Sequence, residues 1–441
     1  MRKNISFIVM VLLAASFAGA LDNTTISARR KRAASAFHDG VLIVHALSRL
    51  DTAADGYRQD PYFYYLTDLE NTVGALLAIA GKSGESWLFL PDHPPFQRGG
   101  LQPEVLPGEV AAKRLGIDHV LEWFELDQFL SRESVSAPTL YYPDDPFGYP
   151  ELPASVLSAK APKAPLWVLE ILHKYSSFEV KEVSDDLNAL MFVQDATEMA
   201  ALRSAAKTTV AALLAGMRAI RPGVPQRIVE SVVEDTCWSA GAHGSDFWPW
   251  SMAGENAVFP RPFFSLALYD HLNKEMRAGE LVRLDVGCEW QHYQGDLGRT
   301  VPVSGHYSDD QRETWNIFVA AYHAGAAALH AGVTADQVYE AWRGELLRHR
   351  GAAKSGLALH AIDSWSKREN VPFWQIHATN LVAARPPSVL PAGMTVNFEP
   401  IASADGQGFF LEDMYLITKD GAELLTPGVP YSAEEIEAEM K

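Results

Sequence analysis

The sequence of 441 residues predicts a protein of two domains, a smaller α/β domain followed by a larger α+β domain. Three observations lead to this prediction. Residues 33 to about 160 alternate short apolar runs with loops rich in Pro and Gly. Residues 196–223 are dense in Ala and Leu, which is typical of a long helix. Two later runs alternate in the manner of strands and carry acidic residues. With 48% apolar residues, the chain can bury more than one core.

The elements of the first domain follow from its apolar runs. We expect short strands at GVLIVHAL, GALLAIA, SWLFLP and HVLEWF. Residues 165–195 then supply a helix, a strand and the passage into the second domain. We place the boundary near residue 186, so the predicted domains are 21–185 and 186–441.

The second domain is expected to open with the long helix, which Arg221-Pro222-Gly223 would end. A second helix is predicted at 225–240, strands at about 247–270 and a further helix at 308–330. Aromatic residues gather in this domain at Phe247, Trp248, Trp250, Phe259, Phe263 and Phe264. Such a cluster is more often core than pocket, but a substrate pocket is the alternative.

The stretch NFEPIASADGQGFFLED, residues 397–413, contains a predicted tight hairpin. Asp405-Gly406 between two apolar runs is a strong signal for a two-residue turn. That turn sets Glu399 opposite Glu412, with Cβ atoms about 4.5–5.5 Å apart. Two carboxylates in this position are either a solvated pair at a sheet edge or ligands of a cation.

Residues 281–303 predict a second hairpin with the same property. With a turn centred between Trp290 and Gln291, Asp285 lies opposite Asp296. Trp-Gln is poor turn chemistry, so a longer loop with a shifted register is the alternative.

Four convergent carboxylates need positive charge nearby. Divalent metals are the simplest source, because they accept carboxylate oxygens and allow bridging. Arginines are the other source. Strand alternation places Arg283 on the face of Asp285 but Arg299 on the face opposite Asp296, and one arginine cannot neutralise four acids.

The segment LDVGCEWQHYQGDLGRTVPVSGHYSDDQR resembles the first metal-binding hairpin of the "pita-bread" metallopeptidases of family M24. The similarity extends to YRQDPYFYYLTDL, the helix from 196 to 223, GEN at 254–256, LPAGMTVNFEP and GFFLED. Within the family the chain looks most like the bacterial Xaa-Pro aminopeptidases. The resemblance implies a C-terminal pita-bread domain (creatinase/aminopeptidase fold) preceded by a creatinase-type α/β domain.

The resemblance also implies five metal ligands: Asp285, Asp296, His377, Glu399 and Glu412. Asp296 and Glu412 would bridge two divalent metals, Asp285 would bind one of them, and His377 with Glu399 the other. Manganese is the first expectation, with cobalt, iron or zinc as alternatives. The implied reaction is release of an N-terminal residue ahead of proline by a hydroxide that bridges the metals, with Glu399 as the proton carrier.

Three positions depart from the family pattern. Arg261 stands where a substrate-facing histidine is usual after GEN, and Ala384 stands where a second histidine is expected seven residues after His377. Phe410 replaces an arginine two residues before Glu412. Arg261 can donate hydrogen bonds to an oxyanion and is our candidate catalytic residue beside Glu399, although its pKa is too high for proton transfer.

Composition bears on location and partners. MRKNISFIVMVLLAASFAGA, residues 1–20, reads as a secretory signal with a small-residue cleavage site, so we expect an exported protein, periplasmic or extracellular, with no stable membrane insertion afterwards. An uncleaved membrane anchor is the alternative. Loss of Arg2 and Lys3 would leave 35 basic and 55 acidic residues, a formal charge of −20, which argues against nucleic acid as a partner. The resemblance implies a homo-oligomer.

Cys237 and Cys288 are the only cysteines, which excludes a disulfide framework. One disulfide requires Cα atoms within about 7 Å. A packed free thiol is the more ordinary expectation for Cys288.

Three functions fit the sequence: an aminopeptidase of the Xaa-Pro type, another metal-dependent hydrolase or lyase acting on a small molecule, and a binding protein without turnover. The substituted Arg261 and Ala384 favour a change of substrate, whereas retention of all five ligands weighs against a pure binding protein.

Overall fold

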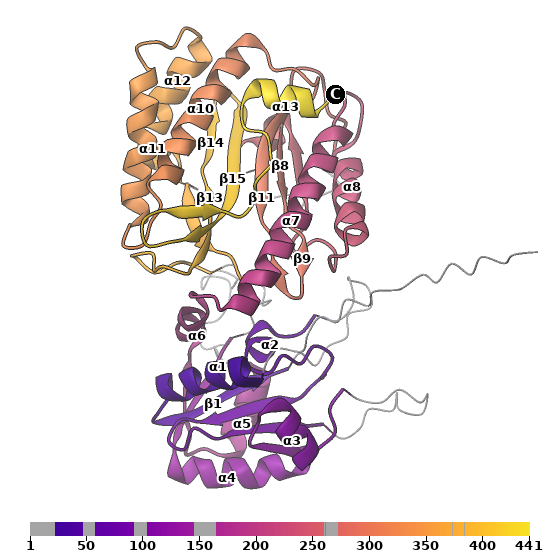
Figure 1. Ribbon diagram of the computed structural model, residues 1–441, viewed down its shortest axis with the longest axis vertical. Coiled ribbons are helices and arrows are strands. Elements are labelled where there is room, and N and C mark those ends of the chain that lie inside the picture. The colour runs from indigo at the N-terminus through magenta and orange to yellow at the C-terminus, as the bar shows by residue number, and fades with distance from the viewer. Residues whose placement is uncertain are drawn as a thin grey trace, which may run out of the picture.

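The computed structural model describes residues 23–46, 58–91, 104–144, 165–259, 261, 272–372, 374–382 and 384–441. The predicted signal segment 1–20 lies outside these residues, as do Phe263 and Phe264 of the aromatic cluster. The described chain forms two lobes, the N-terminal lobe below and the C-terminal lobe above in the view of Figure 1. None of the helices in the described ranges is both long and apolar enough to cross a membrane.

The N-terminal lobe is built on a mixed sheet of six strands in the order β4-β3-β2-β1-β5-β6. Strands β1 and β2 are antiparallel, whereas β1 and β5 run parallel. The four predicted strands are all present. In chain order the elements are α1 Asn23–Ala36, β1 Gly40–His45, α2 Pro61–Thr67, β2 Leu76–Ala80, β3 Ser86–Leu90, α3 Glu109–Leu115, β4 His119–Glu122, the 3₁₀ turn η2 Trp123–Glu125, α4 Leu126–Ser136, β5 Thr139–Tyr142, α5 Leu166–Lys174, β6 Glu179–Glu182 and α6 Ser184–Met191.

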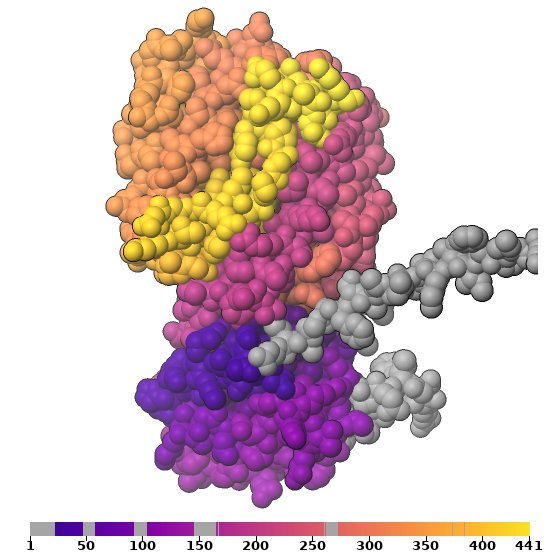
Figure 2. Space-filling model, in the orientation of Figure 1, coloured from indigo at the N-terminus to yellow at the C-terminus, as the bar shows by residue number. Residues whose placement is uncertain are grey.

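The C-terminal lobe contains a larger sheet, whose main path has the order β12-β13-β15-β11-β8-β7, with β14 and β16 also paired to β15. Figure 1 shows helices on both sides of this lobe, α7 and α8 on one side and α10 to α12 on the other. In chain order the elements are α7 Ala196–Ala219, α8 Gln226–Ser239, β7 Trp250–Ala253, η3 Gly254–Ala257, β8 Leu281–Val286, β9 Glu289–Trp290, β10 Tyr293–Gln294, β11 Leu297–Pro302, α10 Asp309–Ala327, α11 Ala335–His349, α12 Gly356–Trp365, η4 Arg368–Asn370, β12 Gln375–Ala378, β13 Thr395–Glu399, β14 Ile401–Ala404, β15 Gln407–Ile417, β16 Ala422–Leu424 and α13 Ala433–Glu439. Figure 2 shows the C-terminal part of the chain, in yellow, lying across the surface of this lobe.

Helix α7 packs against strand β8. The side chain of Asp195 caps the helix by accepting hydrogen bonds from the backbone N–H groups of Thr197 and Glu198. At Gly216 a Cβ atom would lie 3.0 Å from Cδ2 of Leu284, so the helix packs closely on that strand. Since alternate residues of a strand face opposite ways, Arg283 and Asp285 project from the other face of the sheet.

The predicted register of the Asp405-Gly406 hairpin is confirmed. Ile401 in β14 lies opposite Phe410 in β15, and Phe398 in β13 lies opposite Asp413 in β15. The two residue numbers of each pair add to the same value, so the register is unchanged from one side of Glu399 to the other. Asp405 has a φ of 47° and Gly406 a φ of 74°, as a two-residue turn of this kind requires. Glu399 and Glu412 are therefore a facing pair.

The predicted register of the second hairpin is wrong by two residues. Asp285 lies opposite Gly298, and Asp296 immediately precedes β11. The small ribbon of β9 and β10 closes at Gln291 and His292, both of which have positive φ, instead of at Trp290-Gln291. A shift of two residues preserves the alternation, so Asp296 remains on the same face as Asp285.

The two cysteines are joined. Cys237 in α8 and Cys288, two residues after β8, form a disulfide with their Cα atoms 5.5 Å apart. The expectation of a packed free thiol at Cys288 was wrong, because the register of the second hairpin brings the residue directly onto α8. The bond ties this helix to the strand that carries Asp285.

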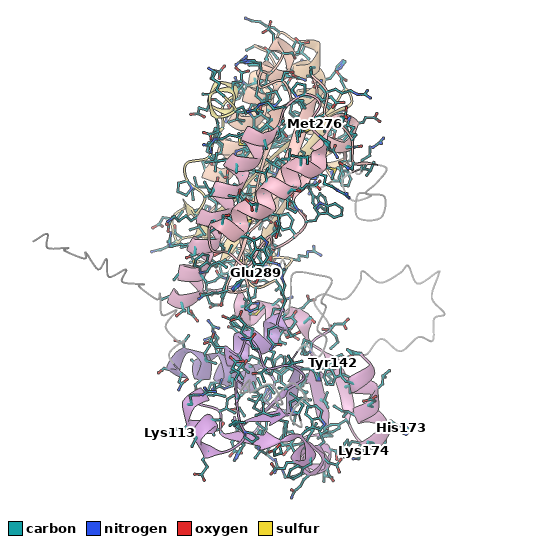
Figure 3. The ribbon with its side chains drawn as sticks, turned by 90° about the vertical axis from the view of Figure 1, so that its right-hand side faces the viewer. Lys113, Tyr142, His173, Lys174, Met276 and Glu289 are labelled. Carbon is teal, nitrogen blue, oxygen red and sulfur yellow. A yellow bond between two sulfur atoms is a disulfide. The ribbon has the colours of Figure 1, made fainter. Side chains whose placement is uncertain are left out.

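Arginines join the two lobes. Arg29 in α1 is buried and donates a hydrogen bond of 2.7 Å to Asp195, the cap of α7. Arg58, from the YRQD motif, donates to the backbone oxygen of Ser245 at 2.7 Å and lies 3.1 Å from a carboxylate oxygen of Glu289. Figure 3 shows Glu289 at the end of the upper lobe that faces the lower one. The motif thus places the N-terminal lobe beside the loop that precedes β7.

Candidate metal centre

Four strands bring the acidic residues to one face of the C-terminal sheet. Asp285 lies in β8, Glu412 in β15 and Glu399 at the end of β13, while Asp296 directly precedes β11. The neighbouring edge strand β12 adds His377. All five predicted ligands therefore converge, although they come from parts of the chain more than 100 residues apart.

The imidazole of His377 lies among three of the carboxylates. Its Nε2 atom is 3.3 Å from Oε1 of Glu412, 3.5 Å from Oδ2 of Asp296 and 3.6 Å from Oε2 of Glu399. The potential ligand atoms form two groups, each within 4.8 Å. One group is Asp296, His377 and Glu412, and the other is Asp285, Glu399 and Glu412. Glu412 belongs to both groups, which is the arrangement of a bridging ligand.

Neighbouring side chains orient these groups. Asn397 donates hydrogen bonds of 2.8 Å to Oε1 of Glu412 and 2.9 Å to the backbone oxygen of Asp296. Gln375 donates to Oε2 of Glu399. Nδ1 of His377 lies 3.2 Å from the backbone oxygen of Ala378. A proton on Nδ1 makes that hydrogen bond, so Nε2 is the ring nitrogen that faces the carboxylates.

Of the two arginines considered for this face, Arg283 reaches the cluster. Its Nη2 atom donates a hydrogen bond of 2.7 Å to Oδ2 of Asp285 and lies 3.5 Å from Oε1 of Glu399. Arg299 is turned to the opposite face and pairs with Asp413 at 3.0 Å. Both arginines therefore lie on the faces that strand alternation predicts.

Burial and mutual repulsion oppose ionisation of the carboxylates. Burial is the largest cause that raises the pKa of Asp285 and of Glu399 to about 7, and repulsion by Glu399 and Glu412, respectively, adds to it. Burial, followed by repulsion from Glu412, raises the pKa of Asp296 well above its ordinary value. For His377, burial lowers the pKa, but the hydrogen bond with Glu412 and the charge of Glu399 outweigh it and bring the pKa to about 9.

These observations fit a pair of divalent metal ions. Four carboxylates and one neutral imidazole form an oxygen-rich donor set of the type that Mn²⁺, Co²⁺, Fe²⁺ and Zn²⁺ accept. Among the described residues, these carboxylates form ion pairs with Arg283 and His377, whose charges leave part of the charge of four carboxylates uncompensated. Asp285 and Asp296 each belong to a different group of ligands, and Glu412 joins the two groups.

A cavity of about 890 Å³ opens onto the five residues. The other described residues that line the cavity are mostly aromatic or apolar, and two of them are arginines. They are Phe247, Trp248, Trp250, Arg368, Pro372, Trp374, Gln375, Ile376, Ala384, Arg385 and Pro386. The aromatic cluster predicted from the sequence therefore contributes to a pocket through Phe247, Trp248 and Trp250, and the interpretation of these three as core was wrong.

The three substituted positions lie in different surroundings. Ala384 lines the cavity, so a methyl group stands where the resemblance implies an imidazole. The ring of Phe410 lies under the guanidinium of Arg283, with 4.1 Å between the ring centroid and Cζ. Arg261 forms an ion pair of 3.0 Å with Glu255 and is not among the described residues that line the cavity. Its catalytic role stays a prediction.

The comparisons with known proteins agree with this arrangement. Residues 200–419 match the model of metallopeptidase family M24, and residues 26–141 match that of the aminopeptidase P N-terminal domain. The chain belongs to metallopeptidase family M24. It is an Xaa-Pro aminopeptidase-like member of that family, and hence a hydrolase with the pita-bread fold. The family uses divalent metals, which agrees with the donor set described above.

Among M24 relatives, an Xaa-Pro aminopeptidase of Escherichia coli is 25% identical over 440 residues, covering 90% of this chain and 93% of the relative. An Xaa-Pro aminopeptidase of Haemophilus influenzae is 23% identical over 86% of this chain and 88% of its own. The structure of E. coli aminopeptidase P with the inhibitor Pro-Leu superposes with a TM-score of 0.75 at 23% identity, covering 96% of this chain and 99% of the other. At that identity the superposition shows the M24 fold alone.

Sequence reasoning missed the residues that orient the predicted metal ligands. Gln375 and Asn397 each lie two residues from a predicted ligand on the same strand, His377 and Glu399 respectively, so they share its face. Strand alternation could have found both. No comparable signal existed for Trp374 or Arg385, which reach the cavity from loops.

Proposed function

We propose that this protein is a dinuclear aminopeptidase that releases an N-terminal residue ahead of proline. The observation that carries the proposal is Glu412, whose carboxylate belongs to both groups of potential ligands, Asp296 with His377 and Asp285 with Glu399. A carboxylate that belongs to both groups could bind two cations that lie side by side.

In the proposed site, Asp285, Asp296, His377, Glu399 and Glu412 hold two divalent cations, manganese by preference. The cations would supply the positive charge that polarises a peptide carbonyl and lowers the pKa of an attacking water. Glu399 accepts the proton of that water and delivers it to the leaving nitrogen. Gln375, by donating to Oε2 of Glu399, fixes the orientation of this carboxylate.

The walls of the cavity suit a short peptide with an apolar second residue. Phe247, Trp250 and Trp374 offer flat apolar surfaces beside the acidic cluster, and a proline ring packs well against such surfaces. The preference for proline itself rests on the resemblance to Xaa-Pro aminopeptidases. The resemblance is also the ground for proposing a homo-oligomer, which sedimentation of the purified protein would test.

The proposal is tested with residues 21–441 and Mn²⁺, supplied with a peptide mixture in which the second residue is or is not proline. Mass spectrometry of the products should show release of the first residue only ahead of proline, and a chelator should abolish it. Glu399→Gln is the matched variant, because it keeps the shape of the side chain but removes the proton acceptor. Cleavage that survives both the chelator and this variant would contradict the proposed mechanism.

A second candidate is a metal-dependent hydrolase or lyase that acts on a small molecule. The observation in its favour is Ala384, which leaves the cavity wall without the imidazole that the resemblance implies. Two bound metals without cleavage of any peptide would favour this candidate. Absence of bound metal would favour a binding protein without turnover.

We also propose that the protein is exported. The basic start and apolar stretch of residues 1–20 support export. The disulfide between Cys237 and Cys288 supports it as well, because such bonds persist mainly in oxidising compartments. Fractionation of cells that express the full chain should place a protein that starts near residue 21 outside the cytoplasm, and a protein that keeps residues 1–20 would contradict the cleavage.

A further inference from the structure

Arg283 is a buried arginine in contact with the acidic cluster. Its side chain is 2% exposed, so its fixed charge is removed from water. Nη2 donates to Asp285 at 2.7 Å and lies 3.5 Å from Glu399, but Nε and Nη1 are buried and have no hydrogen-bond partner among the residues that the structure describes. A buried donor without an acceptor loses the hydrogen bond that it would make with water, so a compensating interaction is needed.

Two aromatic rings provide that compensation. The Cζ atom of Arg283 lies 4.1 Å from the ring centroid of Phe410 and 5.5 Å from that of Trp250. A guanidinium within about 6 Å of an aromatic ring is attracted by its π-electrons, more strongly in the absence of water. The ring of Phe410 therefore holds the guanidinium in place as well as filling space.

Strand β11, which lies between β8 and β15, leaves room for the ring of Phe410 at Gly298. A Cβ atom at position 298 would lie 1.8 Å from Cε1 of Phe410, so any residue other than glycine would collide with it. Gly298 lies directly opposite Asp285 on β8 and Glu412 on β15.

Arg283 and Phe410 flank the same residue of β11. Thr300 lies opposite Arg283 in the ladder with β8, and its side chain exchanges hydrogen bonds with the backbone of Phe410 on β15. Positions 283 and 410 thus stand on either side of one strand and face the same cluster.

We propose that Arg283 is the positioning residue of this metal centre. The family resemblance places an arginine at position 410 on β15. In this protein Arg283 on β8 supplies the guanidinium instead, and Phe410 and Gly298 provide the space and the aromatic surface that hold it. The guanidinium holds Asp285, a ligand in one group, and steadies Glu399, which the proposed mechanism uses for proton transfer. This inference rests on the proposed metal site but not on the identity of the substrate.

The test is Mn²⁺ binding to the metal-free chain, followed through the electron paramagnetic resonance of free Mn²⁺. The variants are Arg283→Val, Phe410→Arg and the double variant Arg283→Val/Phe410→Arg, which moves the arginine from one strand to the other. Arg203→Val is the control, because Arg203 is an exposed arginine paired with Glu423 on the surface. Circular dichroism of each metal-free variant reports whether it is folded.

Loss of an interaction that orients a ligand typically weakens metal binding by about 10–100-fold, and we expect this of Arg283→Val. The Mn²⁺ affinity of the double variant should return to within about threefold of the wild-type value. Phe410→Arg alone should bind Mn²⁺ more weakly than the wild type, because two guanidinium groups compete for Asp285. The control should bind normally. Recovery in the double variant separates positioning from a merely structural ion pair.

Two results would overturn the inference. One is wild-type affinity in Arg283→Val, and the other is a double variant that binds no better than Arg283→Val. If Arg283→Val does not fold, Arg283→Lys takes its place and should bind more weakly than wild type, since the shorter ammonium cannot stack on Phe410 in the same way. A wild-type chain that binds no Mn²⁺ would instead refute the proposed metal site itself.

Discussion

Nε2 of His377 lies 3.3 Å from Oε1 of Glu412, although 35 residues separate them and each comes from a different strand. The imidazole also approaches Asp296 and Glu399 within 3.6 Å. Three carboxylates around one ring nitrogen attract a proton strongly, and they attract a metal ion for the same reason. Protons and metal ions therefore compete for this site.

The first prediction concerns Asp296, a proposed metal ligand in the group with His377 and Glu412. Asp296→Asn keeps the size of the side chain but removes its charge, so metal content should fall from two ions per chain to one or none. Elemental analysis after dialysis against Mn²⁺ measures the content. Asp420→Asn, in an exposed turn, is the matched control and should keep both ions. Unchanged stoichiometry in Asp296→Asn would refute the assignment.

The second prediction concerns the pH dependence of stability without metal. The pKa of Asp285 and of Glu399 rises on folding from ordinary values of 3.8 and 4.5 to about 7, and that of His377 rises from 6.5 to about 9. The folded state therefore binds more protons than the unfolded state between about pH 4 and 9. Stability is greatest at the acid end of this window and falls as the pH rises through 7 and then 9.

Thermal unfolding of the chelated protein at a series of pH values measures this effect. The midpoint should fall as the pH increases from about 5 to 8. Saturating Mn²⁺ should raise the midpoint most at the higher pH, because metal competes with protons for the same groups. A midpoint that rises with pH in the metal-free protein would contradict the assignment of these shifts.

The third prediction concerns the disulfide. Cross-linking Cys237 and Cys288 closes a loop of about fifty residues, for which a stabilisation of about 2–4 kcal/mol is typical. Reduction, or replacement of both residues in Cys237→Ala/Cys288→Ala, should lower the unfolding free energy by that amount in urea. Mn²⁺ affinity should fall as well, because the bond ties α8 to the strand of Asp285. Equal stability of the oxidised and reduced forms would contradict this prediction.

The fourth prediction concerns the cavity wall at Ala384. If the protein cleaves peptides ahead of proline, Ala384→His restores a hydrogen-bond donor beside the scissile bond. Loss of one such donor typically costs about 10²–10³ in rate, so a gain in kcat/KM of at least ~10-fold is expected. Ala384→Leu fills a similar volume without a donor and should give no gain. A loss of activity in both variants would indicate that the pocket has been rebuilt for another substrate.

Much of the site could be predicted from local patterns. Asp405-Gly406 fixes a two-residue turn, and the turn sets the register that makes Glu399 and Glu412 face each other. Strand alternation correctly separated Arg283 from Arg299. In both cases the information is contained in a few neighbouring residues, because turn geometry and the period of two are local properties of the backbone.

Other features were decided only by the tertiary structure. The turn at Gln291 and His292 adopts positive φ in residues that rarely do so, and contacts across the lobes, such as Arg58 with Glu289, hold that ribbon in place. The disulfide depended on the register of the same hairpin. The position of Arg283 over Phe410, which Gly298 permits, required three strands to be assembled in order. A sequence determines which residues share a strand face, whereas the neighbours across that face depend on packing between segments far apart in the chain.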